Sequence, residues 1–474
     1  MGGPKTMAVL ILVARGCLMV TIFVLALYAI RHFVLAMYRL SLTESRDMMG
    51  LVGFVMPRVS VLVPMHNEQA VAADILQALI DCDYDWSRLE ILAINDRSED
   101  RTGEIIDEFA ARYPNIKALH RSSGPGGKGA ALEFASSEAT GEILLVFDAD
   151  YFPGRALLKQ LVAPFCDPEV GAVMGRVVPH NVGTSLLSGL LELERSAGYQ
   201  ISQQARHNLA LAPQYGGTVG GVRVSVLRAV GGWNAHSITE DTDLTFRLLS
   251  HGLKVAYVNR AECYEEAPES WPVRRRQVMR WATGHTECLH RFWRPVLLSR
   301  WLTLPEKVDA LFVLSCYWTA PVLVLGWLAS LVLFFSPQGH TAPVFVVALA
   351  LVGYQLFGSE ATFVELGIGA LLDGNRDRVL LMPLNLFNFF ASTGAICTAL
   401  LKYYLGSLFG TGTHTWHKTI RFRGDGNGTN GHTLPNGGNG NGHVFGGGGT
   451  PDAYRLARAP SGLYFADVTA PLGE

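Results

Sequence analysis

Two aspartates that directly follow a short apolar run are suited to binding a hard metal ion. Asp148 and Asp150 come after Ile143–Phe147, and a single alanine separates them. Mg²⁺ and Mn²⁺ are commonly held by a few carboxylates, with phosphate oxygens completing the coordination shell. The pair therefore predicts a divalent cation that accompanies a nucleotide diphosphate.

A second group of carboxylates stands at the start of a helical stretch. Thr239-Glu240-Asp241 leads into Asp241–Leu249. A carboxylate at this point is suited to removing a proton from an acceptor hydroxyl, which is general-base chemistry. The alternative is that the segment merely caps the helix, as threonine and aspartate commonly do.

Two further segments have the residue types that contact a nucleotide. Asp96 follows the apolar run Leu89–Ile94 and can accept a hydrogen bond from a base or a ribose. Gly124–Gly129 is a glycine-rich loop that opens a helix and contains Lys128. Such loops bring backbone N–H groups and a lysine to a phosphate, although a surface turn is the simpler alternative.

A basic and aromatic cluster follows on a predicted helix. Gln277, Arg280 and Trp281 share one helical face through their i, i+3 and i+4 spacing. An arginine can neutralise a leaving diphosphate, and a tryptophan ring can stack on a sugar. We expect the neighbouring Arg274–Arg276 to form only a basic surface.

The elements that must position these residues alternate between strands and helices over residues 57–265. This alternation predicts βαβ units and a mostly parallel sheet, whose ligands bind at the carboxyl ends of the strands. The predicted strands are Val59–Val63, Leu89–Ile94, Ile143–Phe147 and Val170–Val177. The predicted helices are Glu68–Ile80, Thr102–Tyr113, Lys128–Ser137 and Arg155–Phe165.

Long apolar segments flank this region. The chain has 474 residues, of which 49% are hydrophobic and 17% charged, whereas about a quarter are charged in soluble proteins. One anchor is expected over Met7–Tyr38, and Arg39 and Arg46 after it favour a cytoplasmic position for the next domain. Segments long enough to span a bilayer are 308–335, 343–371 and 379–409.

Two amphipathic stretches and the overall charge complete the picture. Leu186–Gln203 and Trp271–Trp293 are suited to lying along a membrane surface. The net charge is −2, and no basic run is long enough to form a nucleic-acid face, so nucleic acid is not an expected partner.

The order of the motifs resembles one family. PxxNE at Pro64–Glu68, ND…D from Asn95, GGKGAALE, DAD, TED and QxxRW follow one another as in the membrane-bound inverting glycosyltransferases of family 2, which include cellulose, chitin, hyaluronan and curdlan synthases. The resemblance implies a GT-A α/β fold, with a mostly parallel sheet embedded between transmembrane helices. It also implies a UDP-sugar donor and Mg²⁺ or Mn²⁺ as cofactor.

The resemblance also implies roles for individual residues. Asp96 matches the carboxylate that contacts uracil, Lys128 a donor-binding lysine, Asp148 and Asp150 the metal-binding pair, and Asp241 the catalytic base. The residues that match the acceptor and pyrophosphate site are Glu240, Gln277, Arg280 and Trp281. Those that match a gating motif over the donor are Trp416, Lys418, Thr419 and Arg421.

The sequence departs from the family at three positions. Asn95 and Arg97 replace the first acid and the glycine of the usual DDGS, so that recognition of the nucleobase can differ. His66 replaces the common tyrosine of the first motif.

The expected organisation comprises six parts. They are an anchor (1–50), a GT-A domain (51–265), interfacial helices with QxxRW (266–305), transmembrane helices (306–410), a Trp-containing cytoplasmic motif (411–423) and a disordered tail rich in glycine and asparagine (424–474).

Three functions remain open. The first is a multi-pass enzyme of the cell membrane that extends a β-linked polysaccharide, with membrane lipids and secretion proteins as partners. The second is single-sugar transfer to a lipid acceptor, because glucosyldiacylglycerol synthases share this layout. The third is a non-catalytic membrane scaffold, against which the intact acidic set argues.

Overall fold

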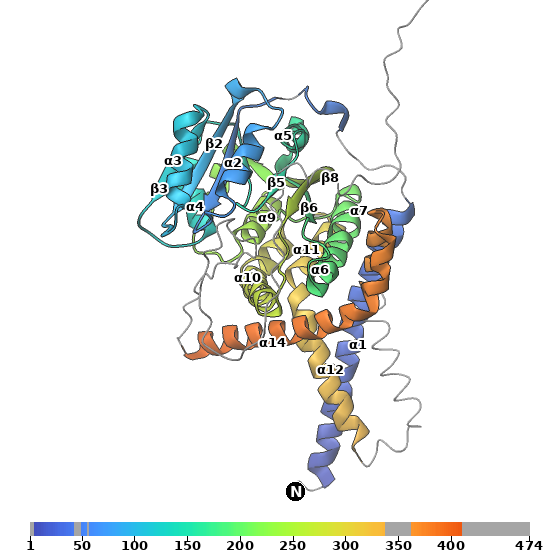
Figure 1. The fold of residues 1–474 in the computed structure, drawn as a ribbon. Helices are drawn as coiled ribbons and strands as arrows, with labels where there is room; N and C mark the ends of the chain where they lie inside the picture. The colour runs from blue at the N-terminus through green and yellow to red at the C-terminus, as the bar shows by residue number, and fades with distance from the viewer. Residues whose placement is uncertain (1–3, 42–48, 55, 337–361, 410–474) are drawn as a thin grey trace, which may run out of the picture. The chain divides into compact units, whose positions relative to one another are not determined.

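The computed structural model describes residues 4–41, 49–54, 56–336 and 362–409. The proposed gating residues Trp416, Lys418, Thr419 and Arg421, and the tail from Gly424, lie outside the described residues. Between the terminal apolar helices the chain forms an α/β domain with one sheet (Figure 1).

The sheet has eight strands in the order β3-β2-β1-β4-β7-β6-β8-β5. Pairing is parallel between β1 and its neighbours β2 and β4, between β2 and β3, and between β6 and β8. It is antiparallel where β7 joins β4 to β6, and where β5 joins β8. The strands are β1 (Val59–Met65), β2 (Leu89–Asp96), β3 (Ile116–Arg121), β4 (Ile143–Val146), β5 (Phe152–Pro153), β6 (Val170–Pro179), β7 (Gly220–Arg223) and β8 (Lys254–Glu265).

Helices separate most of these strands. Those of the α/β domain are α2 (Ala72–Ile80), α3 (Thr102–Arg112), α4 (Lys128–Glu138), α5 (Leu157–Val162), α6 (Leu186–Ser196), the π-helix η4 (Ala197–Gln203), α7 (Gln204–Asn208), α8 (Val224–Ala229) and α9 (Glu240–Ser250). Short 3₁₀ turns are η1 (Met49–Leu51), η2 (Trp86–Arg88) and η3 (Ala163–Cys166). The others are α1 (Pro4–Ser41), α10 (Trp271–Leu298), α11 (Leu304–Leu314), η5 (Cys316–Trp318), α12 (Thr319–Phe334), Thr362–Leu372, η7 (Arg376–Leu384) and α14 (Asn385–Phe409).

Both faces of the sheet are buried, which explains why its central strands read as continuous apolar runs. In β1, Val61 and Val63 pack into a core with α2, α3 and α5. Leu62 packs on the opposite face, in a core with α4, α8 and α9. The expected α/β domain with a mostly parallel sheet is thus confirmed.

The apolar helices differ in part from the expected spans. Three described helices are long and apolar enough to cross a membrane: Lys5–Ser41, Cys316–Phe334 and Arg376–Phe409. The predicted span 308–335 is broken at η5, so that α11 and α12 are separate helices. In Figure 1, α12 runs along α1, which it contacts, whereas α14 runs across them.

The two amphipathic stretches pack within the protein. Most side chains of α6 are buried, and α6 packs against β6 and η7; its position along a membrane surface stays a prediction. The α10 helix packs against α9, α11 and α14. In this way α10 joins the α/β domain to the helices that follow it.

Candidate active site

The Thr239-Glu240-Asp241 segment forms the N-terminus of α9. Glu240 is buried and Asp241 is partly exposed. The Asp241 carboxylate accepts a hydrogen bond from the backbone N–H of Thr242 at 2.7 Å. Negative charge at a helix N-terminus is favoured by the helix dipole, so the fold supports both carboxylates in this position.

Two glycines allow neighbouring helices to approach this acidic segment closely. A Cβ atom on Gly129 of α4 would lie 2.8 Å from the carbonyl oxygen of Asn234 and 3.3 Å from Cβ of Glu240. A Cβ atom on Gly284 of α10 would collide with the Thr239 side chain. The glycine after Lys128 is therefore required for close packing in addition to any contact with phosphate.

Lys128 connects the acidic segment with the aspartate pair. Its Nζ atom lies 2.5 Å from Oδ1 of Asp148, which follows β4. Burial would lower the pKa of Lys128, but Asp148 and Glu240 raise it above its usual value. Lys128 therefore remains protonated and brings positive charge to the carboxyl end of β4.

The two carboxylates at the start of α9 hold protons more tightly than usual. Burial raises the pKa of Glu240 to about 7; the charge of Lys128 opposes this rise and that of Asp241 adds to it. Burial also raises the pKa of Asp241, while Lys128 and Arg280 oppose that rise. A carboxylate with a raised pKa is a better general base near neutral pH.

The aspartate pair fits a cation that arrives with its substrate. Asp150 is buried, and the Asp148 side chain is 31% exposed. No group of three or more His, Cys, Asp or Glu side chains in the described part of the chain is arranged to hold a metal ion. Two carboxylates suit Mg²⁺ or Mn²⁺ when phosphate and water supply the other ligands.

Asp96 lies in an arginine cluster, which the sequence did not predict. Its Oδ1 atom accepts hydrogen bonds from Arg97 Nε and Arg121 Nη1, both at 3.0 Å. His66, the other departure from the family motif, lies with Nδ1 2.7 Å from the Asp96 carbonyl oxygen. Any nucleobase that reaches Asp96 therefore meets a carboxylate already bound by two guanidinium groups.

Gln277 and Trp281 line a small cavity of about 120 Å³. Arg274 lies over the Trp281 ring at 5.3 Å from its centroid and donates to Gln277 Oε1 at 2.9 Å. Arg274 is buried, unlike its exposed neighbours Arg275 and Arg276. The expectation that Arg274 belongs only to a basic surface is wrong, because burial makes it part of the Trp281 cavity.

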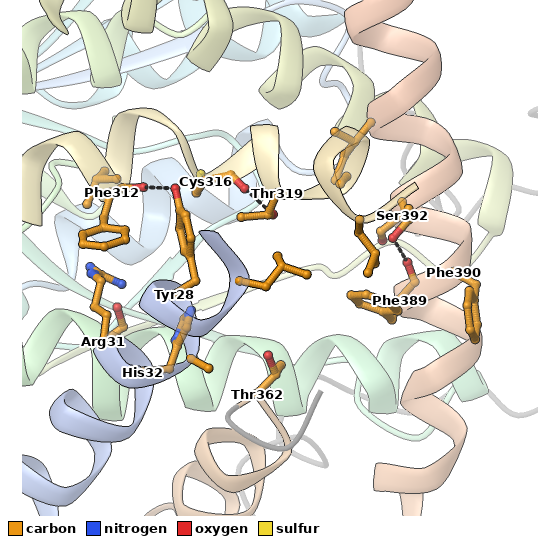
Figure 2. Close-up of a pocket in the computed structure, with 18 of the residues that line it drawn as sticks. Tyr28, Arg31, His32, Phe312, Cys316, Thr319, Thr362, Phe389, Phe390 and Ser392 are labelled. Carbon is orange, nitrogen blue, oxygen red and sulfur yellow. Dashed lines mark hydrogen bonds between the residues drawn. The ribbon is translucent and has the colours of Figure 1, made fainter. Parts of the chain in front are cut away.

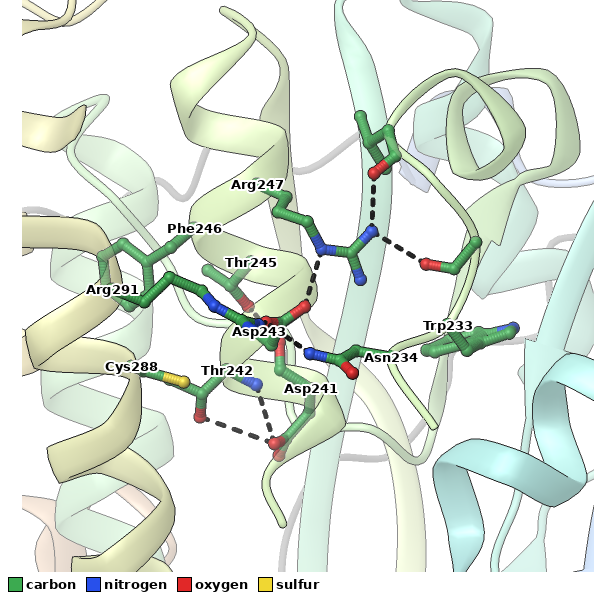
Figure 3. A network of polar contacts seen from close by, with 12 residues as sticks. Trp233, Asn234, Asp241, Thr242, Asp243, Thr245, Phe246, Arg247, Cys288 and Arg291 are labelled. Carbon is green, nitrogen blue, oxygen red and sulfur yellow. Dashed lines mark hydrogen bonds and ion pairs between the residues drawn. The ribbon is translucent and has the colours of Figure 1, made fainter. Parts of the chain in front are cut away.

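A polar network that the sequence did not predict fixes α9 in place. Asp243 is almost fully buried and binds Arg247 at 2.6 Å, Arg291 of α10 at 2.5 Å and the side-chain amide of Asn234 at 3.0 Å (Figure 3). Arg247 also donates to the carbonyls of Val230 and Gly232, at 2.8 Å each. The position of Asp241 thus depends on a buried carboxylate two residues away.

A second set of missed residues lies beside Asp241. Thr242 Oγ1 accepts a hydrogen bond from Gln214 Nε2 at 2.9 Å and lies 3.3 Å from His285 Nε2. Burial lowers the pKa of His285 to about 4, so its ring is neutral near pH 7. The one sequence signal was the i+4 spacing of His285 from Trp281 on the same helix.

Comparison with known proteins finds similarity to glycosyltransferases. Residues 57–284 match the sequence profile described as glycosyltransferase like family 2. The probable glycosyltransferase YdaM of Bacillus subtilis is 34% identical over 240 residues, 50% of this chain and 57% of that protein. A β-monoglucosyldiacylglycerol synthase of Synechocystis sp. is 33% identical over 244 residues, 50% of each protein. Glucomannan 4-β-mannosyltransferase 7 of Arabidopsis thaliana is 28% identical over 260 residues, 53% of this chain and 47% of that protein.

One solved structure supports the fold. The mannosyltransferase PcManGT from Pyrobaculum calidifontis, solved in complex with GDP-Man and Mn²⁺, has a TM-score of 0.53 and 19% identity, covering 77% of this chain and 98% of that one. Residues 57–284 are thus similar to glycosyltransferase like family 2, and the α/β domain has a GT-A-like fold. It spans about half the length of the curated relatives it matches.

Proposed function

We propose that this protein is a multi-pass membrane glycosyltransferase that transfers one sugar, with inversion, from a UDP-sugar to the hydroxyl group of a membrane lipid. The observation that carries the proposal is the convergence of Glu240 and Asp241 with Lys128 and Asp148 at the carboxyl end of β4. A base, a cation and metal-binding carboxylates are the groups that transfer from a nucleoside diphosphate requires.

In the proposed reaction, Asp241 accepts the proton of the acceptor hydroxyl as its oxygen attacks the anomeric carbon. A new glycosidic C–O bond forms, and the bond from that carbon to the diphosphate oxygen breaks with its electron pair. Lys128 and Arg280 face the leaving charge. Asp148 and Asp150 would hold Mg²⁺ or Mn²⁺, which supplies further neutralisation of the diphosphate. Asp96 is assigned to the nucleobase.

A lipid acceptor is favoured over a growing polysaccharide by the surroundings of the site. The cavity at Trp281 is about 120 Å³, and both Arg274 and Arg195 lie over its ring. A larger cavity, of about 380 Å³, lies among the apolar helices. The 33% identity to a glucosyldiacylglycerol synthase points in the same direction.

Polysaccharide extension is the second candidate, and the aromatic ring of Trp281 is the observation that favours it. An aromatic ring can support an acceptor sugar at each cycle of addition. In either case we place the domain on the cytoplasmic side, because arginines follow the first apolar helix.

The test is product analysis with the purified full-length protein. It is incubated with dioleoylglycerol, Mn²⁺ and radiolabelled UDP-glucose, UDP-galactose or UDP-N-acetylglucosamine. We expect one chloroform-soluble product of fixed mass, which EDTA or Asp150→Ala abolishes. Asp107→Asn is the control, because that carboxylate is 61% exposed and outside the site. Label found only in a high-mass glycan would favour polysaccharide extension. Full activity in EDTA would show that the reaction needs no metal ion.

A further inference from the structure

The larger cavity is formed by helices that are distant in sequence. It has a volume of about 380 Å³ and is lined by residues of α1, α7, α11, α12 and α14. Its volume falls within the range of about 300–1,000 Å³ that is typical of small-molecule sites. Because α1 and α12 are long and apolar enough to span a membrane, a ligand of this cavity is most readily supplied by the bilayer.

The two sides of the cavity differ chemically. Tyr28, Arg31 and His32 lie on one side, and Phe389 and Phe390 lie on the other (Figure 2). Leu323 of α12 also lines the cavity. A molecule with a hydrocarbon chain and a polar end matches this division.

Two of the basic side chains on the polar side of the cavity have carboxylate partners. Arg31 binds Asp309 through Nε at 2.9 Å and Nη2 at 2.6 Å, and His32 lies 2.9 Å from Glu365. Arg206 donates to neutral oxygens, including the Ala212 carbonyl at 3.0 Å. The formal charges of the two arginines, Arg31 and Arg206, are thus equal in number to those of the two carboxylates, Asp309 and Glu365. An anionic head group would lose hydration, and Arg206 already donates to oxygens of Ser202, Gln203 and Ala212.

The polar side of the cavity is connected to the proposed base. Gln214 lines the cavity, and its amide donates to Thr242 Oγ1 at 2.9 Å. The Thr242 backbone N–H in turn donates to Asp241 at 2.7 Å. Only Thr242 therefore separates a residue of the cavity wall from Asp241.

From this arrangement we infer that the cavity holds a hydrocarbon chain of an uncharged, hydroxyl-bearing lipid, whose head group reaches Asp241 past Gln214. The inference rests on the proposed function, since it assigns the acceptor of that reaction. It adds a location and a preference: a diacylglycerol-type lipid is accepted and a phosphate-bearing lipid is not.

Two matched tryptophan substitutions on α12 test the location. Leu323 is buried in the cavity wall, whereas Leu328 is 56% exposed on the same helix. We expect Leu323→Trp to raise KM for dioleoylglycerol about tenfold or more and to leave UDP affinity, measured by calorimetry, unchanged. Leu328→Trp should change neither quantity. An unchanged KM in Leu323→Trp overturns the inference.

Photo-crosslinking tests occupancy without relying on a folded variant or on turnover. The wild-type protein is irradiated without donor in the presence of dioleoylglycerol that carries a diazirine on one acyl chain, and the adducts are mapped by mass spectrometry. We expect adducts at buried cavity residues such as Leu323 and Ala320, reduced by unlabelled dioleoylglycerol and not by dioleoylphosphatidic acid. Adducts confined to outward-facing residues such as Leu328, or equal competition by phosphatidic acid, overturn the inference.

These results separate the two proposals. If the wild-type enzyme makes the glycolipid but gives no adduct in the cavity, the proposed function is supported and the cavity is not the lipid-binding site. A wild-type enzyme that labels only glycan removes both the lipid product and the cavity as its acceptor site.

Discussion

The acidic edge of the sheet and the cavity among the apolar helices both contain buried charges, yet they balance them differently. At the sheet edge, Lys128 is close enough to Asp148, Glu240 and Asp241 that all three raise its pKa. In the cavity wall, each carboxylate has a basic partner, as in the Arg31–Asp309 pair. The excess negative charge at the acidic edge of the sheet favours binding of a cation and of a proton. The cavity wall, where positive and negative charges are paired, suits an uncharged ligand.

The largest effect on turnover should come from a substitution at the acidic edge of the sheet. Asp241→Asn keeps the size of the side chain but cannot accept the acceptor's proton, so the transfer rate should fall by about 10²–10⁴-fold. Calorimetry should show UDP affinity close to that of the wild type, because the amide leaves Lys128 and Asp148 in place. A parallel collapse of UDP affinity would instead make Asp241 a donor-binding residue.

A substitution in the cavity wall should instead lower the stability of the folded protein. Asp309→Asn leaves the Arg31 guanidinium without its buried partner, and breaking such a pair costs about 3–5 kcal/mol. Replacing both members, as in Arg31→Met with Asp309→Leu, should recover most of this loss. Denaturation in detergent measures the difference, with the exposed Arg101–Glu104 pair as a control that should matter far less. Equal losses in the single and double variants would contradict a balanced wall.

The extent of prediction from sequence also differs between regions. Strands β1, β2, β4 and β6 were predicted, because burial on both faces leaves a continuous apolar run. The edge strand β3, with Lys117 and His120, and the short β7, with two glycines, have no such run. Their strand character comes from pairing with neighbours.

The sequence motifs contain the candidate site residues. The residues that hold them in place were not predicted. Lys128, Asp148 and Asp241 stand in recognisable segments, and the fold gathers them. Asp243 and Gln214 act through contacts with residues far along the chain, such as Arg291 of α10. Spacing along one sequence carries no information on such contacts, which is also why the burial of Arg274 was not foreseen.

Close packing at the acidic segment gives an intermediate effect. Gly129→Ala places a methyl group against backbone and Glu240, and overpacking of this kind costs about 1–3 kcal/mol. Transfer activity should fall with stability, because the same shift displaces the start of α9. Gly154→Ala is the matched control, since a Cβ atom there has no neighbour within 4 Å. Equal melting temperatures for the two variants would show that α4 and α9 can separate without cost.

The smallest effect should appear in the pH dependence of kcat/KM. It tests whether the negative charges of Glu240 and Asp241 raise each other's pKa. The pKa of Glu240 is raised to about 7 by burial, with Asp241 adding to the rise. Burial also raises the pKa of Asp241, which must be unprotonated to act as the base, so kcat/KM should increase as the pH rises through this raised pKa and decrease below it. Glu240→Gln removes the neighbouring negative charge and thereby lowers the pKa of Asp241, which moves the acid limb to lower pH by about one unit, equivalent to about 1.4 kcal/mol.

Glu287→Gln supplies the matched control for this shift. Burial also raises the pKa of Glu287 to about 7, with Arg291 opposing, but Glu287 is on α10 and takes no part in the interaction by which Asp241 raises the pKa of Glu240. Its substitution should leave the acid limb at its wild-type position. If both variants moved the limb equally, the limb would report general burial of carboxylates. A shift in Glu240→Gln alone would establish that the unbalanced pair at the start of α9 sets the proton affinity of the base.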